Sequence, residues 1–276
     1  MKRILTIQDI SCVGKCSITV ALPIVSAMGV ECAILPTAVL STHTMFKNFT
    51  CCDLTGEVTP ITNHFMSENL KFDALYTGYL ATKEQIDLMK KLFADFKTED
   101  NITFCDPAMA DNGKLYPAFD MDFAKHMATL CATADIIVPN ITEASFMTGT
   151  EYKEVYDEKY VKDLLIKLTD LGAKIAVLTG VSFKEGTTGA MAYDKKNDEF
   201  FYYSHEKQPK SYHGTGDIFS STFIGAMMRG KDYKEAIKVA ANFTSEAIRL
   251  TIADASNPWY GVNFEEAIPY LLNSLN

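Results

Sequence analysis

Short apolar runs alternate with amphipathic stretches along the first two thirds of the chain. RILTIQ at residues 3–8 and KIAVLTG at 174–180 are near-continuous apolar runs, whereas KEQIDLMKKLFADFK at 83–97 carries its apolar residues at helical spacing. Short apolar runs that alternate with helices are typical of parallel strands buried on both faces. The pattern therefore predicts an α/β protein built around a central, mostly parallel sheet.

The same pattern assigns most of the chain to elements. The predicted strands are 3–8, 31–40, 72–80, 102–107, 135–140 and 174–180, and the predicted helices are 16–29, 83–97, 123–134, 158–172, 217–230, 233–251 and 264–275. Residues 190–204 form two β-rich runs around a polar turn, which predicts an antiparallel hairpin at a sheet edge. Because no Pro-, Gly- or Ser-rich linker interrupts residues 1–276, we expect one domain, a three-layer α/β/α sandwich with ligands at the carboxyl ends of the strands.

Composition and charge exclude several classes of protein. The net charge is −9 and no basic patch stands out, so a nucleic-acid partner is not expected. The first apolar run breaks at Gln8 and Asp9, which argues against a signal peptide, and no apolar run reaches the roughly 18 residues of a membrane span. Seven cysteines without a CxxC pair predict reduced thiols in a cytoplasmic protein and no zinc site, with Cys12 as a candidate reactive thiol.

A Gly-Lys pair near the N-terminus raises the question of a phosphate-binding P-loop. That motif needs a first Gly five positions before the Gly of the pair, and Ser or Thr directly after the Lys. Asp9 stands five positions before Gly14, and Cys16 directly follows Lys15. The P-loop interpretation is therefore rejected, and a phosphate-binding loop must lie elsewhere in the chain.

The segment YHGTGDIFSSTF at 212–223 is the strongest candidate for that loop. Gly214 and Gly216 bracket Thr215, and Asp217 then opens a long apolar helix. Glycines leave room for an anion beside the backbone, and the amides at a helix N-terminus favour negative charge. Asp217 has two interpretations: a helix cap, or a general base beside an anion hole for a transferring phosphoryl group.

The motifs of the whole chain, taken in order, resemble the ribokinase-like superfamily and most closely its pyridoxal (vitamin B6) kinases. The matching segments are LTIQ at 5–8, LSTHT at 40–44, TGY at 77–79, CDP at 105–107, PNxxE at 139–143 and GTGD at 214–217. The resemblance implies the ribokinase-like fold and ATP-dependent phosphorylation of the hydroxymethyl group of a B6 vitamer. It also implies a homodimer, Mg²⁺ bound with ATP, Asp217 as the base, and the amides of Gly214, Thr215 and Gly216 around the phosphoryl group.

On the vitamin side, the resemblance makes residues 8–17 the substrate loop after the first strand. Many pyridoxal kinases carry Gln-Ser where this chain has Gln8 and Asp9. An Asp there could accept a hydrogen bond from the ring hydroxyl or pair with a protonated ring nitrogen, and it could equally indicate a different substrate. Ser11 is interpreted either as a neighbouring contact or as an ordinary loop or cap residue.

Three further residues are assigned to the substrate by the same resemblance. His43 and Thr44 lie in the polar loop after the second strand and match the family's substrate segment. Tyr79 follows a Gly at a strand end, where its ring could stack on a flat heterocycle or simply pack in the core.

On the nucleotide side, candidate residues follow neighbouring strands. Asp106 ends one strand, and Asn140 and Glu143 follow the next. Carboxylates there can hold Mg²⁺ directly or through water, so Asp106 and Glu143 are the candidate metal residues. Asn140 and Glu143 could instead only start a helix. Thr179 and Gly180 resemble the family's phosphate or ribose contacts. A monovalent cation beside Mg²⁺ stays open.

The polar, Gly-containing segment MADNGKLY at 109–116 is a candidate flap over ATP, because loops that exclude water often gate phosphoryl transfer. A plain surface loop is the alternative interpretation of this segment.

Three other functions remain in view. A hydroxymethylpyrimidine kinase of thiamine synthesis has the same fold, but such enzymes often carry Cys at the position of Asp217. Sugar kinases of the superfamily usually carry an inserted β-lid early in the chain, and no clear insertion of that kind is seen. A catalytically silent vitamin-binding protein would not need the base of the GTGD motif.

Overall fold

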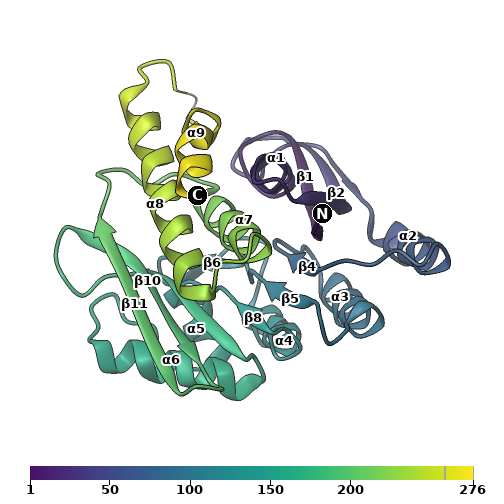
Figure 1. Cartoon of the computed structure of the whole chain (residues 1–276), viewed down its shortest axis with the longest axis horizontal. Coiled ribbons are helices and arrows are strands. Elements are labelled where there is room, and N and C mark those ends of the chain that lie inside the picture. The colour runs from purple at the N-terminus through teal and green to yellow at the C-terminus, as the bar shows by residue number, and fades with distance from the viewer. Residues whose placement is uncertain (258, 276) are drawn as a thin grey trace. The chain divides into compact units, whose positions relative to one another are not determined.

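The computed structural model describes residues 1–257 and 259–275, which form two compact units. Unit 1 comprises Met1–Ala74 and Lys207–Asn276, and unit 2 comprises Leu75–Glu206. Each unit combines strands with helices (Figure 1), which confirms the predicted α/β class. Organisation as one continuous domain stays a prediction.

The strands of unit 1 are β1 (Arg3–Val13), β2 (Glu31–Thr42) and β3 (Cys51–Asp53). β1 pairs parallel to β2, and β2 pairs antiparallel to β3. The prediction that a loop begins at residue 8 is wrong, because β1 continues to Val13. A register shift between Gln8 and Ile10 lets the polar end of β1 keep pairing with β2, as β-bulges do.

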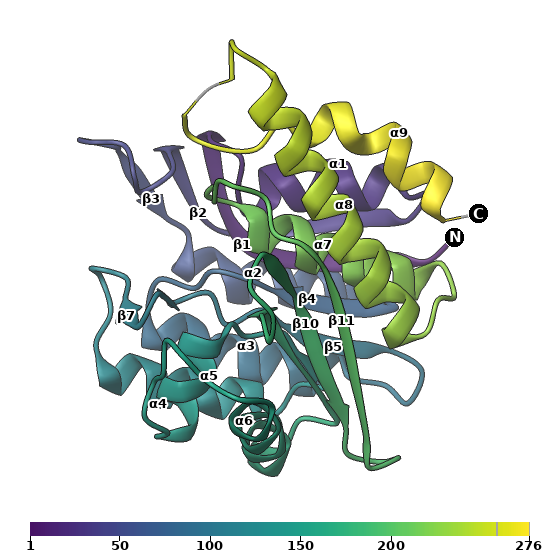
Figure 2. The same cartoon turned by 90° about the vertical axis from the view of Figure 1, so that its left-hand side faces the viewer.

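The helices of unit 1 are α1 (Ile18–Ala27), α2 (Thr55–Ser67), α7 (Thr215–Met228), α8 (Tyr233–Ala253) and α9 (Phe264–Ser274). α1 packs on α7, α7 on α8, and α8 on α9, an arrangement that Figure 2 shows. β3 and α2 lie where the sequence predicted no element. All three residues of β3 are exposed and α2 buries only Val58 and Thr62, so neither carries a periodic apolar pattern.

The strands of unit 2 follow the order β11-β10-β9-β8-β5-β4. Their bounds are β4 (Ala74–Thr77), which starts at the boundary of the unit, β5 (Ile102–Cys105), β8 (Ile136–Ile137), β9 (Ile175–Val181), β10 (Thr187–Asp194) and β11 (Glu199–Glu206). β5, β8 and β9 pair in parallel, whereas β9 with β10 and β10 with β11 pair antiparallel. The predicted edge hairpin is therefore confirmed.

A row of four helices accompanies these strands, with α3 packed on α4, α4 on α5, and α5 on α6 (Figure 1). The helices are α3 (Lys83–Phe96), α4 (Met121–Cys131), α5 (Ile141–Thr148) and α6 (Glu158–Leu171). Each begins at a polar residue whose side chain accepts a backbone N–H of the first turn. Each cap satisfies a backbone donor that has no partner within its helix. The apolar pattern predicted no helix over α5 and placed the start of α4 two residues late, at residue 123.

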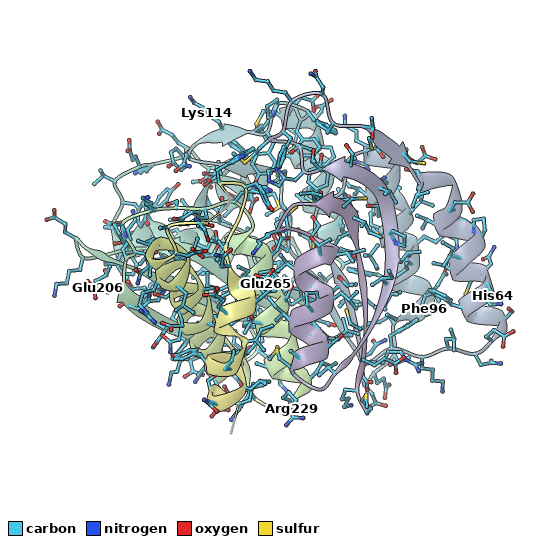
Figure 3. The ribbon with its side chains drawn as sticks, turned by 90° about the horizontal axis from the view of Figure 1, so that it is seen from above. His64, Phe96, Lys114, Glu206, Arg229 and Glu265 are labelled. Carbon is cyan, nitrogen blue, oxygen red and sulfur yellow. The ribbon has the colours of Figure 1, made fainter. Side chains whose placement is uncertain are left out.

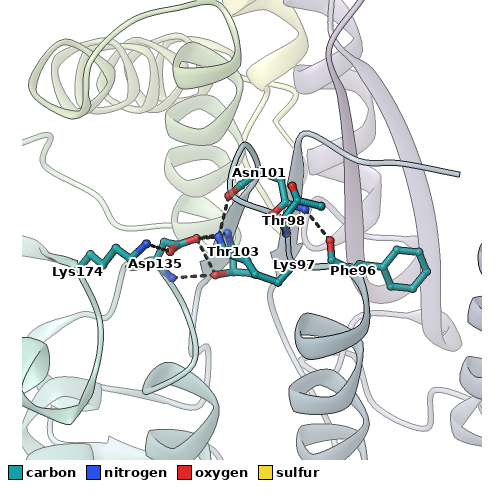
Figure 4. A network of polar contacts seen from close by, with 7 residues as sticks. All are labelled: Phe96, Lys97, Thr98, Asn101, Thr103, Asp135 and Lys174. Carbon is teal, nitrogen blue, oxygen red and sulfur yellow. Dashed lines mark hydrogen bonds and ion pairs between the residues drawn. The ribbon is translucent and has the colours of Figure 1, made fainter.

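A network around Asp135 ties the starts of two strands to neighbouring loops (Figure 4). Asp135 accepts hydrogen bonds from the backbone N–H of Thr103 at 2.8 Å and from its hydroxyl at 2.9 Å, and it pairs with Lys97 and, at 2.8 Å, with Lys174. Burial raises the pKa of Asp135, but the hydrogen bonds from Lys174, Lys97 and Thr103 outweigh burial and lower it overall. The folded state therefore favours the charged carboxylate.

No helix in the part of the chain that the structure describes is long and apolar enough to cross a membrane. All seven cysteines are free thiols, as predicted.

We expect Asp135→Asn to lower the free energy of unfolding by about 1–3 kcal/mol at neutral pH, because both lysines lose their anion. Since the folded pKa of Asp135 lies below its unfolded value, this stability is present above the ordinary Asp range and is lost as pH falls through the folded value. Urea titrations at about pH 7 and below about pH 4 should show the difference shrinking in acid. The control is Asp163→Asn, which removes a solvent-exposed pair with Lys159 and should change the stability much less than Asp135→Asn does. A deficit that does not shrink in acid would contradict the electrostatic explanation.

Candidate active site

The start of α7 presents backbone donors without a side-chain cap. Gly214 is the N-cap, with φ of 84° and ψ of 0°, and a Cβ built there would lie 1.9 Å from the carbonyl oxygen of Lys15. The first helical hydrogen bond runs from the N–H of Ile218 to the oxygen of Gly214. The amides of residues 215–217 thus have no acceptor within the helix, and the helix dipole adds partial positive charge there. This end of α7 is suited to an anion.

Asp217 is the third residue of α7, because the helix begins at Thr215 and not at Asp217 as predicted. Asp217 is half-buried, and its charge affects the pKa of the nearby Cys16 thiol. Burial, followed by the charges of Asp217 and Asp9, raises the pKa of Cys16, which is only 5% exposed. Cys16 therefore stays a protonated thiol at neutral pH.

Asp9 and Ser11 are bonded to each other in the polar end of β1. Asp9 is 4% exposed, and its Oδ2 accepts a hydrogen bond from the Ser11 hydroxyl at 3.1 Å. Burial raises the pKa of Asp9, while hydrogen bonds from Ser17 and Ser11 oppose the rise. Ser11 therefore orients the carboxylate of Asp9, and both residues lie on a strand instead of the predicted loop.

His43 begins the loop after β2, and both of its ring nitrogens bind backbone. Nδ1 accepts the N–H of Met45 at 3.2 Å, so Nε2 carries the proton and donates it to the carbonyl oxygen of Tyr260 at 2.9 Å. Both ring nitrogens of His43 are therefore committed to backbone, and the residue is only 2% exposed. Thr44 follows it as an exposed residue.

His213 is a site residue to which the sequence analysis assigned no role. Its ring centroid lies 4.6 Å from that of His43. Burial, followed by the charge of His43, lowers the pKa of His213 to about 4, so this ring is neutral at pH 7. The two histidines join Phe46, Trp259 and Tyr260 in an aromatic cluster. The sequence signal that could have identified His213 is its position directly before the Gly-Thr-Gly of the GTGD motif.

In unit 2, Asn140 and Glu143 form a capping box at the start of α5. Glu143 accepts the N–H of Asn140 at 2.8 Å with one oxygen, and the N–H groups of Met109 and Ala110 at 3.0 and 3.4 Å with the other. The amide nitrogen of Asn140 donates to the oxygen of Ala110 at 2.7 Å. Asn140 and Glu143 thus start a helix, as one of the two interpretations expected. They also anchor the base of the candidate flap through their hydrogen bonds to Met109 and Ala110.

Asp106 and Glu143 are two buried carboxylates that influence each other. Asp106 is 7% exposed and Glu143 is 3% exposed. Burial, and then the charge of Asp106, raise the pKa of Glu143 well above its usual range, a situation that a cation would relieve. Because both oxygens of Glu143 already accept amides, these residues fit Mg²⁺ held through water. Within the described residues, no three His, Cys, Asp or Glu side chains gather as a metal site.

The candidate flap at 109–116 is an ordered hairpin. β6 (Ala110–Asp111) and β7 (Lys114–Leu115) pair antiparallel around Asn112 and Gly113, whose φ angles of 50° and 74° suit a two-residue hairpin turn. The N–H of Gly113 donates to the Thr142 hydroxyl at 3.0 Å, and a Cβ at Gly113 would lie 2.8 Å from the Tyr152 ring. The hairpin is therefore held against α5 at its tip as well as at its base.

The remaining predicted residues lie in or beside the strands of unit 2. Thr179 forms a parallel bridge with Asn140, and Gly180 is an exposed residue with φ of 73° inside β9. Tyr79 is half-buried after β4, with its ring 5.7 Å from that of Phe119.

The predicted residues thus fall into two groups, one in each unit. Unit 1 holds Asp9, Ser11, His43, Thr44, Gly214, Thr215, Gly216 and Asp217, and unit 2 holds Tyr79, Asp106, Asn140, Glu143, Thr179 and Gly180. Tyr79 was assigned to the substrate with the first group, yet it shares a unit with the nucleotide candidates.

Comparison with known proteins finds kinases. The family described as phosphomethylpyrimidine kinase matches residues 18–259. A hydroxymethylpyrimidine/phosphomethylpyrimidine kinase from Aquifex aeolicus is 30% identical over 203 residues, which cover 70% of this chain and 76% of the relative.

Two solved structures share the fold over almost the whole chain. A protein from Bacteroides thetaiotaomicron, assigned as a phosphomethylpyrimidine kinase and solved with pyridoxal, is 34% identical with a TM-score of 0.93, over 98% of this chain and 95% of that one. Pyridoxal kinase from Lactobacillus plantarum is 28% identical with a TM-score of 0.90, over 99% and 97% of the two chains. The likeness confirms the ribokinase-like fold expected from the sequence.

We expect Glu143→Gln to lower the free energy of unfolding by about 1–3 kcal/mol without any ligand, because its new amide group would face a backbone donor. Chemical denaturation of the unliganded protein measures this loss. Glu84→Gln is the matched control, since Glu84 lies in the first turn of α3 but is exposed. If the two variants unfold alike, Glu143 does not anchor the flap base.

Proposed function

Because the chain belongs to the phosphomethylpyrimidine kinase family, we propose that it transfers the γ-phosphoryl group of ATP to the hydroxymethyl group of a vitamin B6 vitamer. Pyridoxal, pyridoxine and pyridoxamine all carry that group. The motifs that resemble pyridoxal kinases and the pyridoxal bound by the relative from Bacteroides thetaiotaomicron support a B6 vitamer as the acceptor.

The start of α7 is the observation that carries this proposal. Uncapped amides at residues 215–217 are suited to the oxygens of a transferring phosphoryl group, and Asp217 lies in the same helical turn. The glycine N-cap is pressed against the carbonyl oxygen of Lys15 and brings no side chain to the helix start, which leaves room there for an anion. The arrangement combines an anion site with a base, which is what phosphoryl transfer to a hydroxyl requires.

In the acceptor half of the reaction, unit 1 supplies the contacts. Asp9, oriented by Ser11, would bind the ring hydroxyl or a protonated ring nitrogen of the vitamer. The face of His43 would pack on the ring, with Thr44 beside it. Because His213 is neutral at pH 7, it would add packing beside His43 and no positive charge.

In the nucleotide half, unit 2 supplies the contacts. Asp106 and Glu143 would hold Mg²⁺ through water, and Mg²⁺ bound with ATP would neutralise charge on the phosphate oxygens. Asn140, Thr179 and Gly180 would contact phosphate or ribose, and the hairpin at 109–116 would cover the nucleotide.

In the transfer step, the hydroxymethyl oxygen of the vitamer attacks the γ-phosphorus. Asp217 takes the hydroxyl proton as the new O–P bond forms, and the bond to the β-phosphate oxygen breaks to release ADP. The amides of residues 215–217 stabilise the charge that develops on the phosphoryl oxygens. Catalysis on this scheme is mainly positioning and electrostatics.

Phosphorylation of hydroxymethylpyrimidine is the second candidate function. The relative from Aquifex aeolicus carries that activity in its name, and the matched family is named for the related phosphomethylpyrimidine. The compound also presents a hydroxymethyl group on a flat, nitrogen-containing ring. The same base and anion site would serve it, so the difference lies in how Asp9 and its neighbours contact the ring.

The proposed function is tested by ADP release from Mg-ATP with pyridoxal, pyridoxine, pyridoxamine, hydroxymethylpyrimidine and ribose as acceptors. We expect turnover with one or more B6 vitamers, and Asp217→Asn should lower kcat by roughly 10²–10⁴-fold with ATP still bound. Glu235→Gln is the matched control, because Glu235 occupies the same position of the first turn of α8.

Each other outcome has a definite meaning. Turnover of hydroxymethylpyrimidine alone would establish the second function. Binding without turnover of any acceptor would indicate a non-catalytic vitamin-binding protein. Near-native turnover by Asp217→Asn would refute Asp217 as the base.

We expect Asp9→Ser to change the ratios of kcat/KM among the three B6 vitamers and hydroxymethylpyrimidine, because these compounds differ in the ring groups that a buried carboxylate would contact. The KM for ATP should stay unchanged and serves as the internal control. Equal losses for all acceptors would mean that Asp9 supports the fold of β1 and does not read the ring.

A further inference from the structure

Lys15, rejected above as a P-loop lysine, makes contacts that the proposed mechanism does not use. Its Nζ donates to Oδ1 of Asn263 at 2.9 Å and to Oε2 of Glu265 at 2.8 Å, near the start of α9, where Figure 3 labels Glu265. The side chain of Lys15 is 18% exposed and its ammonium lies 5.8 Å from the ring centroid of Phe264. The ammonium is thus directed at α9, so Lys15 can affect the start of α7 only through its backbone.

That backbone is where other loops of unit 1 come closest. Gly214 contacts the carbonyl oxygen of Lys15. Gly261 lies against the aliphatic part of the Lys15 side chain, and a Cβ built at Gly261 would be 2.5 Å from the Lys15 Cβ. Gly14 lies against His43, where a Cβ would be 2.8 Å from the ring. The turn at residues 14–17 therefore supports both the anion site and the histidine.

The turn itself is strained and needs anchoring. Ser17 has φ of 51° and ψ of −134°, a conformation that favours glycine. On one side, the hydroxyl of Thr19 donates to the oxygens of Gly14 and Cys16 at 2.9 and 2.8 Å. On the other side, the ammonium of Lys15 provides the charged anchor.

The anchor of Lys15 is itself firmly held. Asn263 is 8% exposed, its side-chain amide donates to Asp254 at 2.8 Å, and its backbone N–H donates to the hydroxyl of Thr251 at 2.8 Å. Since Thr251 lies in α8, the ammonium ties the turn to the end of a long helix.

We propose that Lys15 is a positioning residue for phosphoryl transfer: held by Asn263 and Glu265, it fixes the turn on which the start of α7 and the ring of His43 rest. The inference builds on the proposed function, because it assigns the acceptor site and Asp217 to the surroundings of this turn. A displacement of about 1 Å at a reacting group can cost on the order of 10²-fold in rate. Loss of the anchor should therefore impair use of the acceptor much more than binding of ATP.

The test compares Lys15→Met, which keeps the stem but removes the charge, with Lys15→Arg, which restores a cation able to bridge two oxygen acceptors. We expect Lys15→Met to lower kcat/KM for the acceptor by roughly 10–100-fold with KM for ATP within about twofold, and Lys15→Arg to recover most of the loss. Gly261→Ala should reproduce the effect, because its methyl group would push the Lys15 stem. Lys2→Met is the control, since it removes another lysine–carboxylate pair of unit 1, with Asp73 at 2.8 Å.

A second readout does not depend on turnover. Trp259 is the only tryptophan of the chain and is 60% exposed, with its ring 4.6 Å from Phe46 and 6.1 Å from the ring of Tyr260, whose oxygen binds His43. Release of Asn263 from Lys15 should loosen this neighbourhood. Acrylamide should then quench Trp259 more strongly in Lys15→Met and Gly261→Ala than in the wild type or Lys2→Met.

The outcomes separate this inference from the proposed function. An active wild type with Lys15→Met indistinguishable from Lys2→Met, or with a loss confined to KM for ATP, overturns the positioning role and leaves the kinase intact. A wild type inactive on every acceptor defeats the proposed function, and the quenching comparison alone then supports or overturns the anchor. Should Lys15→Met fail to fold, Gly261→Ala takes its place in the comparison with Lys2→Met.

Discussion

The close approach between Gly214 and the carbonyl of Lys15 is the constraint on which unit 1 depends. Any side chain at position 214 would overlap that oxygen, so only glycine lets α7 begin where it does. Because glycine has no side chain, the N-cap residue cannot cap the first amides of α7 with a side-chain oxygen. One backbone contact therefore sets both the packing of the turn after β1 and the anion-binding character of the helix start.

Several polar side chains in both units use their hydrogen-bonding atoms on the backbone, which limits the hydrogen bonds that they can make to a ligand. His43 uses both ring nitrogens on loop backbone, and Glu143 uses both carboxylate oxygens on amides. A ligand would meet such residues through a ring face or through water. The hydrogen bonds of these residues hold loops in place, so the candidate site residues also stabilise the local structure around them.

Some features of the candidate site could be predicted from short motifs, because Gly, Asn and Asp at strand or helix ends carry a local signal. The helix cap at Asn140 and the strand-end position of Asp106 were found in this way, whereas the start of α7 was placed two residues too late. His213 was missed, because a single histidine carries no periodic signal and its low pKa arises from burial beside His43. β3 and α2 were missed because their residues are mostly exposed and lack apolar periodicity.

The α/β class and the edge hairpin followed from the sequence alone, because apolar periodicity and turn residues are local properties. The candidate residues followed from short motifs and their resemblance to a kinase family. The tertiary structure was needed to show that β1 continues through Asp9 and that Ser11 orients this carboxylate. It was also needed to show that Lys15 binds Asn263, which is 248 positions away in the chain. These features depend on which distant segments pack together. Hydrogen bonds and close glycine contacts between such segments leave no periodic trace in the chain that forms them.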